Sequence, residues 1–278
     1  MITRPITRSI TRSITRSVTA GIGGAAVPAY QALLDLNPIL LVPSINDARA
    51  EGRLWQDAAM TTPATAVDDP VGAVEDFSGN GYHLTQSTSG ARPLLKQDGG
   101  GNWYLLPDGA NDTMSTAAIN LTSTTAITVS RAGQYKAGLR CILSSSSSPE
   151  ATAGAFEIFD DGSFYFLATG NNGYTSASIT YPSVDDVFTS SAVCDFSLAT
   201  NEVSIATKNN TDALSGRLHN TNNTGNFGNH AFHLFSQGGT GWWSVSPLYG
   251  LFVRPAASTL EELAVIESYL ASQSGVTL

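Results

Sequence analysis

Charge, cysteine and long apolar runs are all scarce in this sequence of 278 residues. Asp, Glu, Lys and Arg together make up only 13% of it, while Gly, Ser, Thr and Asn are abundant. Because no run of about 20 apolar residues occurs, we expect no membrane span. The first residues alternate Ile with Arg and contain no continuous apolar segment, which argues against a secretory signal peptide. This composition is typical of short strands joined by many turns.

Only two cysteines are present, Cys141 and Cys194, and each lies in an apolar stretch. Without a signal peptide, two buried thiols are favoured over a disulfide, although the sequence leaves their pairing open. Neither has a second Cys or a His at the spacing of zinc ligands, so we expect no zinc site.

Four side chains with oxygen atoms, Asp76, Asp108, Asn111 and Asp112, could offer ligands to calcium. Calcium takes about six to eight oxygen ligands, and this spacing does not supply them from one loop. We therefore favour ordinary turn structure at these residues, and we predict neither a metal nor a cofactor.

Positive charge is concentrated at the amino terminus. Arg4, Arg8, Arg12 and Arg16 are four of the 14 basic residues, and the first 17 residues contain no acid. The rest of the chain has ten basic against 23 acidic residues, a formal charge of −13. Because nucleic-acid binding requires a basic face, this acidic body argues against nucleic acid as a partner. A short basic arm on an acidic body suggests that the arm docks on another surface.

Residues 2–19 form an internal repeat with a period of four residues. In an extended chain this period puts every Ile and Arg on one face, whereas in a helix the Ile stripe would drift by about 40° per repeat. We predict an extended arm over 1–19 that is disordered until it meets a partner. It is either a low-complexity tail without a task or an anchor, and the repeated apolar position favours the anchor. The expected anchor residues are Ile2, Arg4, Ile6, Arg8, Ile10, Arg12, Ile14 and Arg16.

Residues 20–38 read as a flexible linker followed by a short helix over 30–36. A first strand over 39–42 opens a domain that extends over 39–278. From Thr125 onward, β-rich segments alternate with turn clusters and no long helix intervenes, which indicates an antiparallel sandwich. The expected strands there are 126–129, 139–143, 155–159, 163–168, 187–193, 203–206, 231–235 and 248–253.

Two local signals stand out in this part of the chain. Asp160-Asp161-Gly162 lies between two expected strands and predicts a tight hairpin. Ser258-Thr259-Leu260-Glu261 predicts a capping box that begins a carboxy-terminal helix, with Ser258 as the N-cap and Glu261 reaching back. Leu263, Ile266 and Leu270 then recur at helical spacing, and Gly275 supplies the stop.

A series of turn and strand motifs runs from Leu54 to Asp112. Asn80-Gly81 and Asp108-Gly109 are turn signals beside apolar segments. The series in chain order is Trp55-Gln56-Asp57, Thr62-Pro63-Ala64-Thr65-Ala66-Val67, Pro70-Val71-Gly72, Asp76-Phe77-Ser78-Gly79-Asn80-Gly81 and Arg92-Pro93. It resembles a segment that recurs in bacteriophage tail and virion proteins, where it leads into a laminin-G-like, concanavalin A-type jelly roll.

The carboxy-terminal strand and helix are similar to the end of laminin-G-like and pentraxin-like jelly rolls. The resemblance implies an all-β fold, an antiparallel concanavalin A-like jelly-roll sandwich with one carboxy-terminal helix and an extended amino-terminal arm. It further implies a virion location, attachment of the arm to other virion proteins, and several symmetric copies of the chain.

Some glycosidases of this fold carry paired carboxylates on one strand, about 5 Å apart across a cleft. The nearest match is Glu157-Ile158-Phe159-Asp160-Asp161, in which Glu157 and Phe159 would share one face. Asp160 would instead open a glycine-containing turn, so the pattern is broken and we predict no enzymatic activity.

Three histidines, His219, His230 and His233, come within 15 residues in a segment rich in Asn and Gly. On a strand, His230 and His233 would point to opposite faces. No nucleophile or metal-helix motif accompanies them, so hydrogen-bonding histidines are the favoured interpretation.

The candidate binding surface is aromatic. Trp242 and Trp243 precede the last strand, and Asn226 and Asn229 lie in a nearby Gly/Asn-rich loop. Carbohydrate recognition combines an aromatic platform with polar side chains, because sugars present CH faces and hydroxyl groups together. One or both Trp could instead fill the core. We expect a phage virion protein whose arm anchors it to the tail and whose lectin-like domain binds a host-surface glycan, with a capsid decoration protein and a polysaccharide-degrading tail enzyme as alternatives.

Overall fold

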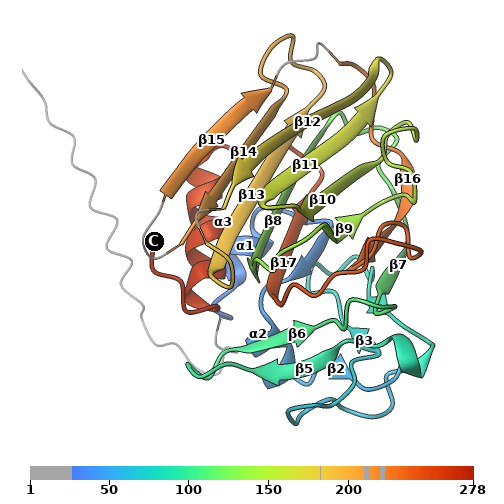
Figure 1. Cartoon of the computed structure of the whole chain (residues 1–278), viewed down its shortest axis with the longest axis vertical. Helices are drawn as coiled ribbons and strands as arrows, with labels where there is room; N and C mark the ends of the chain where they lie inside the picture. Colours follow the sequence, from blue (N-terminus) through green and yellow to red (C-terminus); the bar gives the residue numbers. More distant parts are fainter. Residues whose placement is uncertain (1–26, 182, 210–212, 220–222) are drawn as a thin grey trace, which may run out of the picture.

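A computed structural model describes residues 27–181, 183–209, 213–219 and 223–278 (Figure 1). The predicted arm over 1–19, with every expected anchor residue, lies outside the described residues, as does most of the predicted linker. Within the described residues, two antiparallel sheets face each other, and one long helix follows the last strand. The prediction of an all-β antiparallel sandwich with a carboxy-terminal helix is therefore confirmed.

The first sheet, sheet A, has eight strands within the described part of the chain. Their order is β15-β14-β13-β8-β17-β6-β5. The short strand β1 stands outside this order and pairs with β17. The strands are β1 (Leu40–Val42), β5 (Leu94–Gln97), β6 (Trp103–Leu106), β8 (Ala126–Gln134), β13 (Val187–Asp195), β14 (Val203–Lys208), β15 (Ala213–His219) and β17 (Leu248–Arg254).

The second sheet, sheet B, has nine strands among the described residues, in the order β12-β11-β10-β9-β16-β7-β4-β3-β2. They are β2 (Leu54–Trp55), β3 (Ala73–Val74), β4 (Leu84–Thr85), β7 (Met114–Asn120), β9 (Arg140–Ser144), β10 (Phe156–Asp160), β11 (Ser163–Gly170), β12 (Gly173–Thr180) and β16 (Asn229–Leu234). The turn signal Asn80-Gly81 falls in the connection between the paired strands β3 and β4, as its sequence predicts.

The described α-helices are α1 (Gln31–Leu34), α2 (Ile45–Ala50) and α3 (Leu260–Ser272), and a single 3-10 turn spans Ser89–Ala91. Two of the three helices, α2 and α3, lie against sheet A, and α1 contacts α3. The long helix α3 contacts β8, β13 and β17, while α2 contacts β6 and β17. Because β8 and β13 have neighbours on both faces, nearly every residue of these two strands is buried. None of the described helices has both the length and the apolar character needed to cross a bilayer.

The capping box of α3 begins one residue later than the sequence predicted. The side chain of Thr259, not Ser258, accepts from the backbone N–H of Glu262, and the Glu262 carboxylate accepts from Thr259 N. Glu261 therefore does not reach back. The chain offers two overlapping cap sequences, and the one used allows Glu262 to pair with Arg254 at 2.7 Å.

The core lies between the two sheets and is rich in aromatic rings. Phe156 contacts Phe166, Phe227 and Phe232, with ring centroids 5.1 to 6.4 Å apart. Cys141 and Cys194 are both buried and unpaired, as predicted from their apolar surroundings.

Asp160 corrects one sequence-based prediction. It is the last residue of β10 and is completely buried, whereas the hairpin loop that was expected to include it consists of the residues that follow. Its carboxylate accepts from Nη2 of Arg131, at 2.7 and 2.8 Å, across the space between the sheets. The turn preference of Asp160 does not decide its position, because the buried guanidinium of Arg131 requires a counter-charge in the interior.

Candidate functional site

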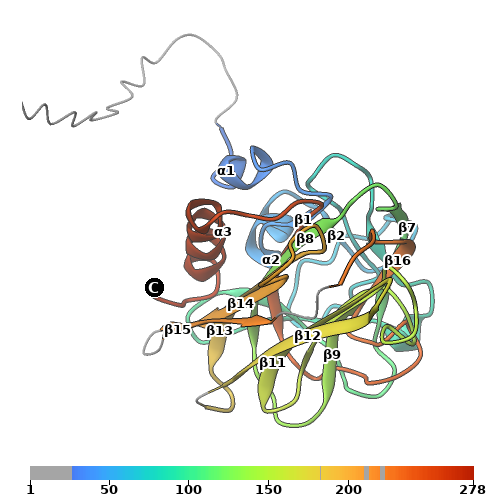
Figure 2. The ribbon, with the colours of Figure 1, turned by 90° about the horizontal axis from the view of Figure 1, so that it is seen from above.

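The outer face of sheet B is the broad sheet surface that the described helices leave uncovered. Helices α1 and α3 lie on one side of the molecule, and β9, β11 and β12 lie on the other (Figure 2). Side chains of β10 and β11 alternate strictly here, so that Ile158, Phe164 and Phe166 are buried in the core. Phe159 and Tyr165, which alternate with these residues, therefore point outward.

Three aromatic rings form a continuous line on this outer face, which we call the aromatic row. Phe159 of β10 and Tyr165 of β11 are paired across the strands, with ring centroids 4.7 Å apart and planes 3° from parallel. The ring of Trp242 meets Phe159 edge-on at 5.8 Å. Trp242 is 37% exposed, and the other two rings are half-buried.

Trp242 reaches the row because a tight turn, residues 236–242, folds back over the sheet from the end of β16. We call it the covering turn. Gln237 N donates to Gly241 O at 2.8 Å, and Cys141 N of β9 donates to Trp242 O at 2.9 Å. Gly238 N donates to the Ser144 hydroxyl at 2.7 Å. A Cβ on Gly238 would lie 2.3 Å from Ser147 N, so only glycine fits this close approach.

Under the covering turn lies a buried carboxylate, that of Glu157. Its Oε2 accepts from Nε2 of Gln237 at 3.1 Å, and its Oε1 has no hydrogen-bond partner in the part of the chain that the structure describes. Burial raises the pKa of Glu157 to about 7; the hydrogen bond from Gln237 acts in the opposite direction, and the negative charge of Glu150 adds to the rise.

Two titratable groups on the neighbouring strands, Cys141 of β9 and His233 of β16, are neutral at pH 7. Burial raises the pKa of the Cys141 thiol well above its usual value, and burial lowers the pKa of His233. His233 pairs with Ser144, which in turn pairs with Glu157. Within the described ranges, no three His, Cys, Asp or Glu side chains come together in a way that could hold a metal ion.

Comparison with solved structures finds β-sandwiches of similar shape at low sequence identity. The ligand-binding domain of botulinum neurotoxin serotype D, in complex with N-acetylneuraminic acid, has a TM-score of 0.54 at 10% identity, over 85% of this chain and 52% of that one. This chain has a lectin-like β-sandwich fold. The binding domain of serotype G has a TM-score of 0.52 at 10% identity, over 72% of this chain and 48% of that one.

An arabinofuranosidase complexed with arabinofuranosyl-alpha-1,2-xylobiose has a TM-score of 0.50 at 14% identity, over 74% of this chain and 51% of that one. The lectin-like sandwich thus spans about half the length of these structures. No protein-family model and no curated protein matches the sequence.

The lectin-like sandwich separates the four side chains that the sequence grouped as a binding surface. Trp242 is exposed and Trp243 is half-buried, which agrees with the expectation that at most one need be exposed. Asn226 donates from Nδ2 to Thr122 O, and Asn229 opens β16. Six residues of extended chain, about 20 Å, separate Asn229 from the start of the covering turn. The two Asn residues therefore lie at the opposite end of β16 from the turn that carries Trp242.

Phe159, Tyr165 and Gln237 belong to the site and were not identified from the sequence. The signal that could have found the first two is the period of two in a strand: with Phe156, Phe164 and Phe166 on the core face, Phe159 and Tyr165 fall on the opposite face. Gln237 carried no such signal, since its contact with Glu157 joins residues that are 80 positions apart.

The other polar candidates stabilise local structure. Asp76 accepts from Leu41 N, Ser78 N and the Ser78 hydroxyl. Asp108 accepts from three backbone N–H groups of its own turn, and these bonds lower its pKa against the opposing effect of burial. Burial raises the pKa of Asp112, which accepts from Asp108 N, to about 6. These contacts fit the turn structure that we favoured over calcium ligation. Of the histidines, His230 lies 3.4 Å from Ala153 O through Nε2.

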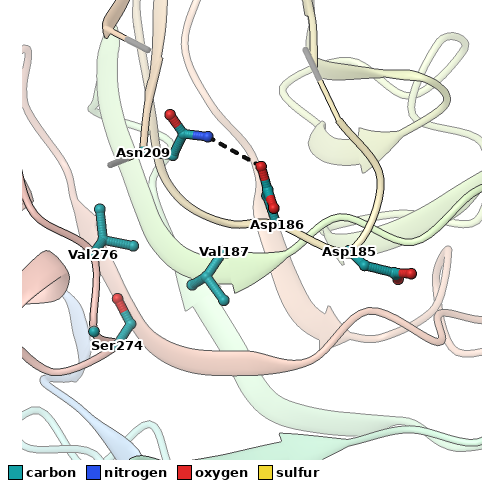
Figure 3. A pocket seen from close by; sticks show the side chains of 7 residues that line it. Asp185, Asp186, Val187, Asn209, Ser274 and Val276 are labelled. Atoms are coloured by element: carbon teal, nitrogen blue, oxygen red, sulfur yellow. Dashed lines mark hydrogen bonds between the residues drawn. The ribbon is translucent and has the colours of Figure 1, made fainter. Parts of the chain in front are cut away.

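A cavity of about 330 Å³ lies away from the aromatic row, between the start of β13 and the segment after α3. Figure 3 shows Asp186 turned toward Asn209 and Asp185 turned away. Asp186 also accepts from the Ser183 hydroxyl, and Asp185 forms an ion pair with Lys136 at 2.7 Å. Since both carboxylates already have partners, this cavity is a weaker candidate than the aromatic row.

Proposed function

We propose that this chain is a glycan-binding domain and that the sugar docks on the aromatic row. The observation that carries the proposal is the line Tyr165-Phe159-Trp242 on the outer face of sheet B, which no described helix covers. Aromatic rings match the CH faces of a sugar, while the covering turn beside them offers backbone and amide groups to its hydroxyls. Two similar folds, the serotype D domain and the arabinofuranosidase, were solved with bound sugars.

Binding rather than cleavage is the activity that the carboxylates support. Asp160 faces the interior and pairs with Arg131, while Glu157 lies beneath the covering turn on the opposite face of the same strand. Two carboxylates on opposite faces of a sheet cannot flank one glycosidic bond, which a glycosidase of this fold would require.

The wider role that we propose is attachment of a bacteriophage virion to its host. Its support is the motif series from Trp55 to Pro93 and the Ile/Arg repeat of residues 2–19, both read from the sequence. In this proposal the arm binds another virion protein, several copies surround a symmetric particle, and the sandwich presents the aromatic row outward.

A glycan array probed with the full chain and matched variants tests the binding site. Trp242→Ala and Tyr165→Ala should each lower the affinity for the bound glycan about two- to tenfold, since an aromatic contact contributes roughly 0.5–1.5 kcal/mol. Tyr174→Ala is the control: Tyr174 is 54% exposed on β12, four residues from Ser178, which pairs with Tyr165. It therefore lies about 13 Å along the strand from the row and should bind as the wild type does.

Absence of any bound glycan, or equal binding by the wild type and Trp242→Ala, would contradict the proposal. New reducing ends released from a bound polysaccharide would show a cleaving enzyme instead.

A further inference from the structure

The covering turn is built with unusual backbone at both of its ends. Phe235, just before it, has a φ of 68°, and Trp242, its last residue, has a φ of 48°. Non-glycine residues rarely occupy this left-handed region, and they remain there only where the surroundings hold them. Phe235 is completely buried, so one end is fixed by the core. The other end carries the aromatic ring that completes the row.

Two side chains of the sheet fasten the middle of this turn. Ser144 of β9 donates to Ser236 O at 3.0 Å and accepts from Gly238 N. Glu157 of β10 accepts from the side-chain amide of Gln237. Ser144 has no charge to change, whereas Glu157 is a carboxyl group whose ionisation would place a charge under the turn.

We infer that Glu157 and Gln237 are positioning residues for the aromatic row: their contact holds the covering turn closed, and ionisation of Glu157 loosens it. The inference rests on the proposed function, because it describes how Trp242 is held for binding.

The surroundings of Glu157 favour its neutral form. Cys141 of β9 and His233 of β16 are neutral at pH 7, Leu167 of β11 is apolar, and Gln237 of the turn is an uncharged amide. Glu150, in the connection before β10, is the charged neighbour, and it carries the same sign. Among the described residues, an ionised Glu157 therefore has one hydrogen bond, one unpartnered oxygen and no cation to pair with.

The sign of the pH effect follows from the raised pKa. The closed turn gives Glu157 a pKa of about 7, against 4.5 for an unperturbed glutamate, so the closed form binds the proton more tightly than the open form. Closure is most stable below pH 4.5 and weakens as the pH rises through 7. Between pH 5 and pH 7 the opening equilibrium should increase about tenfold or more.

Amide hydrogen exchange of residues 236–242 in the full chain, corrected for the intrinsic effect of pH, measures this opening without any ligand. The wild type should show the increase, and Glu157→Gln should remove it, since the amide cannot ionise. Glu150→Gln is the matched control: it removes a nearby exposed charge and leaves the hydrogen bond between Gln237 and Glu157 in place, so it should keep the increase. Gln237→Ala should exchange faster at both pH values and should also weaken binding on the glycan array.

Equal corrected exchange at pH 5 and pH 7 in the wild type would overturn the inference, and this result does not depend on any variant folding. A full pH response in Glu157→Gln would overturn it as well. If the exchange responds to pH but no glycan binds, the proposed function fails while the hold of Glu157 on the turn stands. If glycans bind and the corrected exchange does not change with pH, only the positioning role of Glu157 and Gln237 is wrong.

Discussion

Replacing Asp160 with Asn should destabilise the protein by about 3–5 kcal/mol, because it leaves a charged guanidinium in the core without its counter-charge. Arg131 comes from β8 of sheet A and Asp160 from β10 of sheet B, so this ion pair joins the two sheets. The Tyr181 hydroxyl donates to Asp160 at 2.9 Å and lies 2.7 Å from Arg131 Nη2. Among the described residues, Asp160 is the only acid that pairs with Arg131.

The expected loss of stability is large because few other groups compensate the buried charge of Arg131. Its Nε and Nη1 are buried and have no hydrogen-bond partner within the described ranges. Burial alone would lower the pKa of Arg131, but attraction to Asp160 outweighs it and raises that pKa, so the guanidinium carries its charge in the folded protein. An Asn at position 160 keeps the shape and an acceptor oxygen but loses the charge. A loss of 3–5 kcal/mol corresponds to a fall in Tm of roughly 10 °C in a domain of this size.

Urea denaturation followed by tryptophan fluorescence, together with the thermal transition, measures the loss. The matched control is Asp161→Asn, the exposed neighbour in the same hairpin, which should change stability by less than about 0.5 kcal/mol. The double variant Arg131→Met, Asp160→Leu should recover most of the loss, because an apolar pair removes the desolvation cost of both charges. A loss below about 1 kcal/mol for Asp160→Asn, or a double variant no more stable than the single one, would refute this reasoning.

Two further predictions concern the ends of the chain. Thr259→Ala removes the cap of α3 and should cost about 1 kcal/mol in urea denaturation, while Ser258→Ala, at the cap that the helix does not use, should cost much less. Removal of residues 1–19 should leave the thermal transition of the sandwich unchanged and abolish incorporation into virus particles; a truncated chain that still enters particles would contradict the anchor hypothesis.

The sequence predicted those elements whose periodicity is set by the core. The buried residues Ile266 and Leu270 of α3 recur at the spacing of one helix face, and β17 reads Leu-Tyr-Gly-Leu-Phe-Val-Arg, which is apolar at most positions. In such segments one neighbour, the core, decides the pattern of side chains. Local sequence and tertiary structure then favour the same conformation, and the element can be predicted from the sequence alone.

Two of the strands that were not expected from the sequence are rich in small polar residues. β7 reads Met-Ser-Thr-Ala-Ala-Ile-Asn, and β12 reads Gly-Tyr-Thr-Ser-Ala-Ser-Ile-Thr. Their Ser, Thr and Ala side chains fit a sheet but do not mark a strand by hydrophobic alternation. β12 pairs with β11 over its whole length, so pairing with a strongly apolar neighbour defines it.

Asp160 shows why a local rule can fail at one residue of a correct hairpin. The sequence Asp-Asp-Gly does form the connection between β10 and β11, as predicted. Its first residue nevertheless lies in the strand and faces inward, because Arg131, 29 positions earlier, needs a carboxylate there. No pattern within the hairpin contains that information.

The aromatic row was only partly predictable because nearness in sequence and nearness in the fold differ at this site. Asn229 is 13 positions from Trp242 and lies at the far end of β16, since an extended strand carries each residue away by about 3.4 Å. Phe159 is much farther away in sequence but touches Trp242, because the covering turn reverses the chain onto the neighbouring strands. That reversal depends on positive φ angles at Phe235 and Trp242, which neither residue favours by itself. A turn held against its local preference is sensitive to the side chains that fasten it, which is why Glu157 and Gln237 offer a sharper test of this surface than the exposed aromatic rings do.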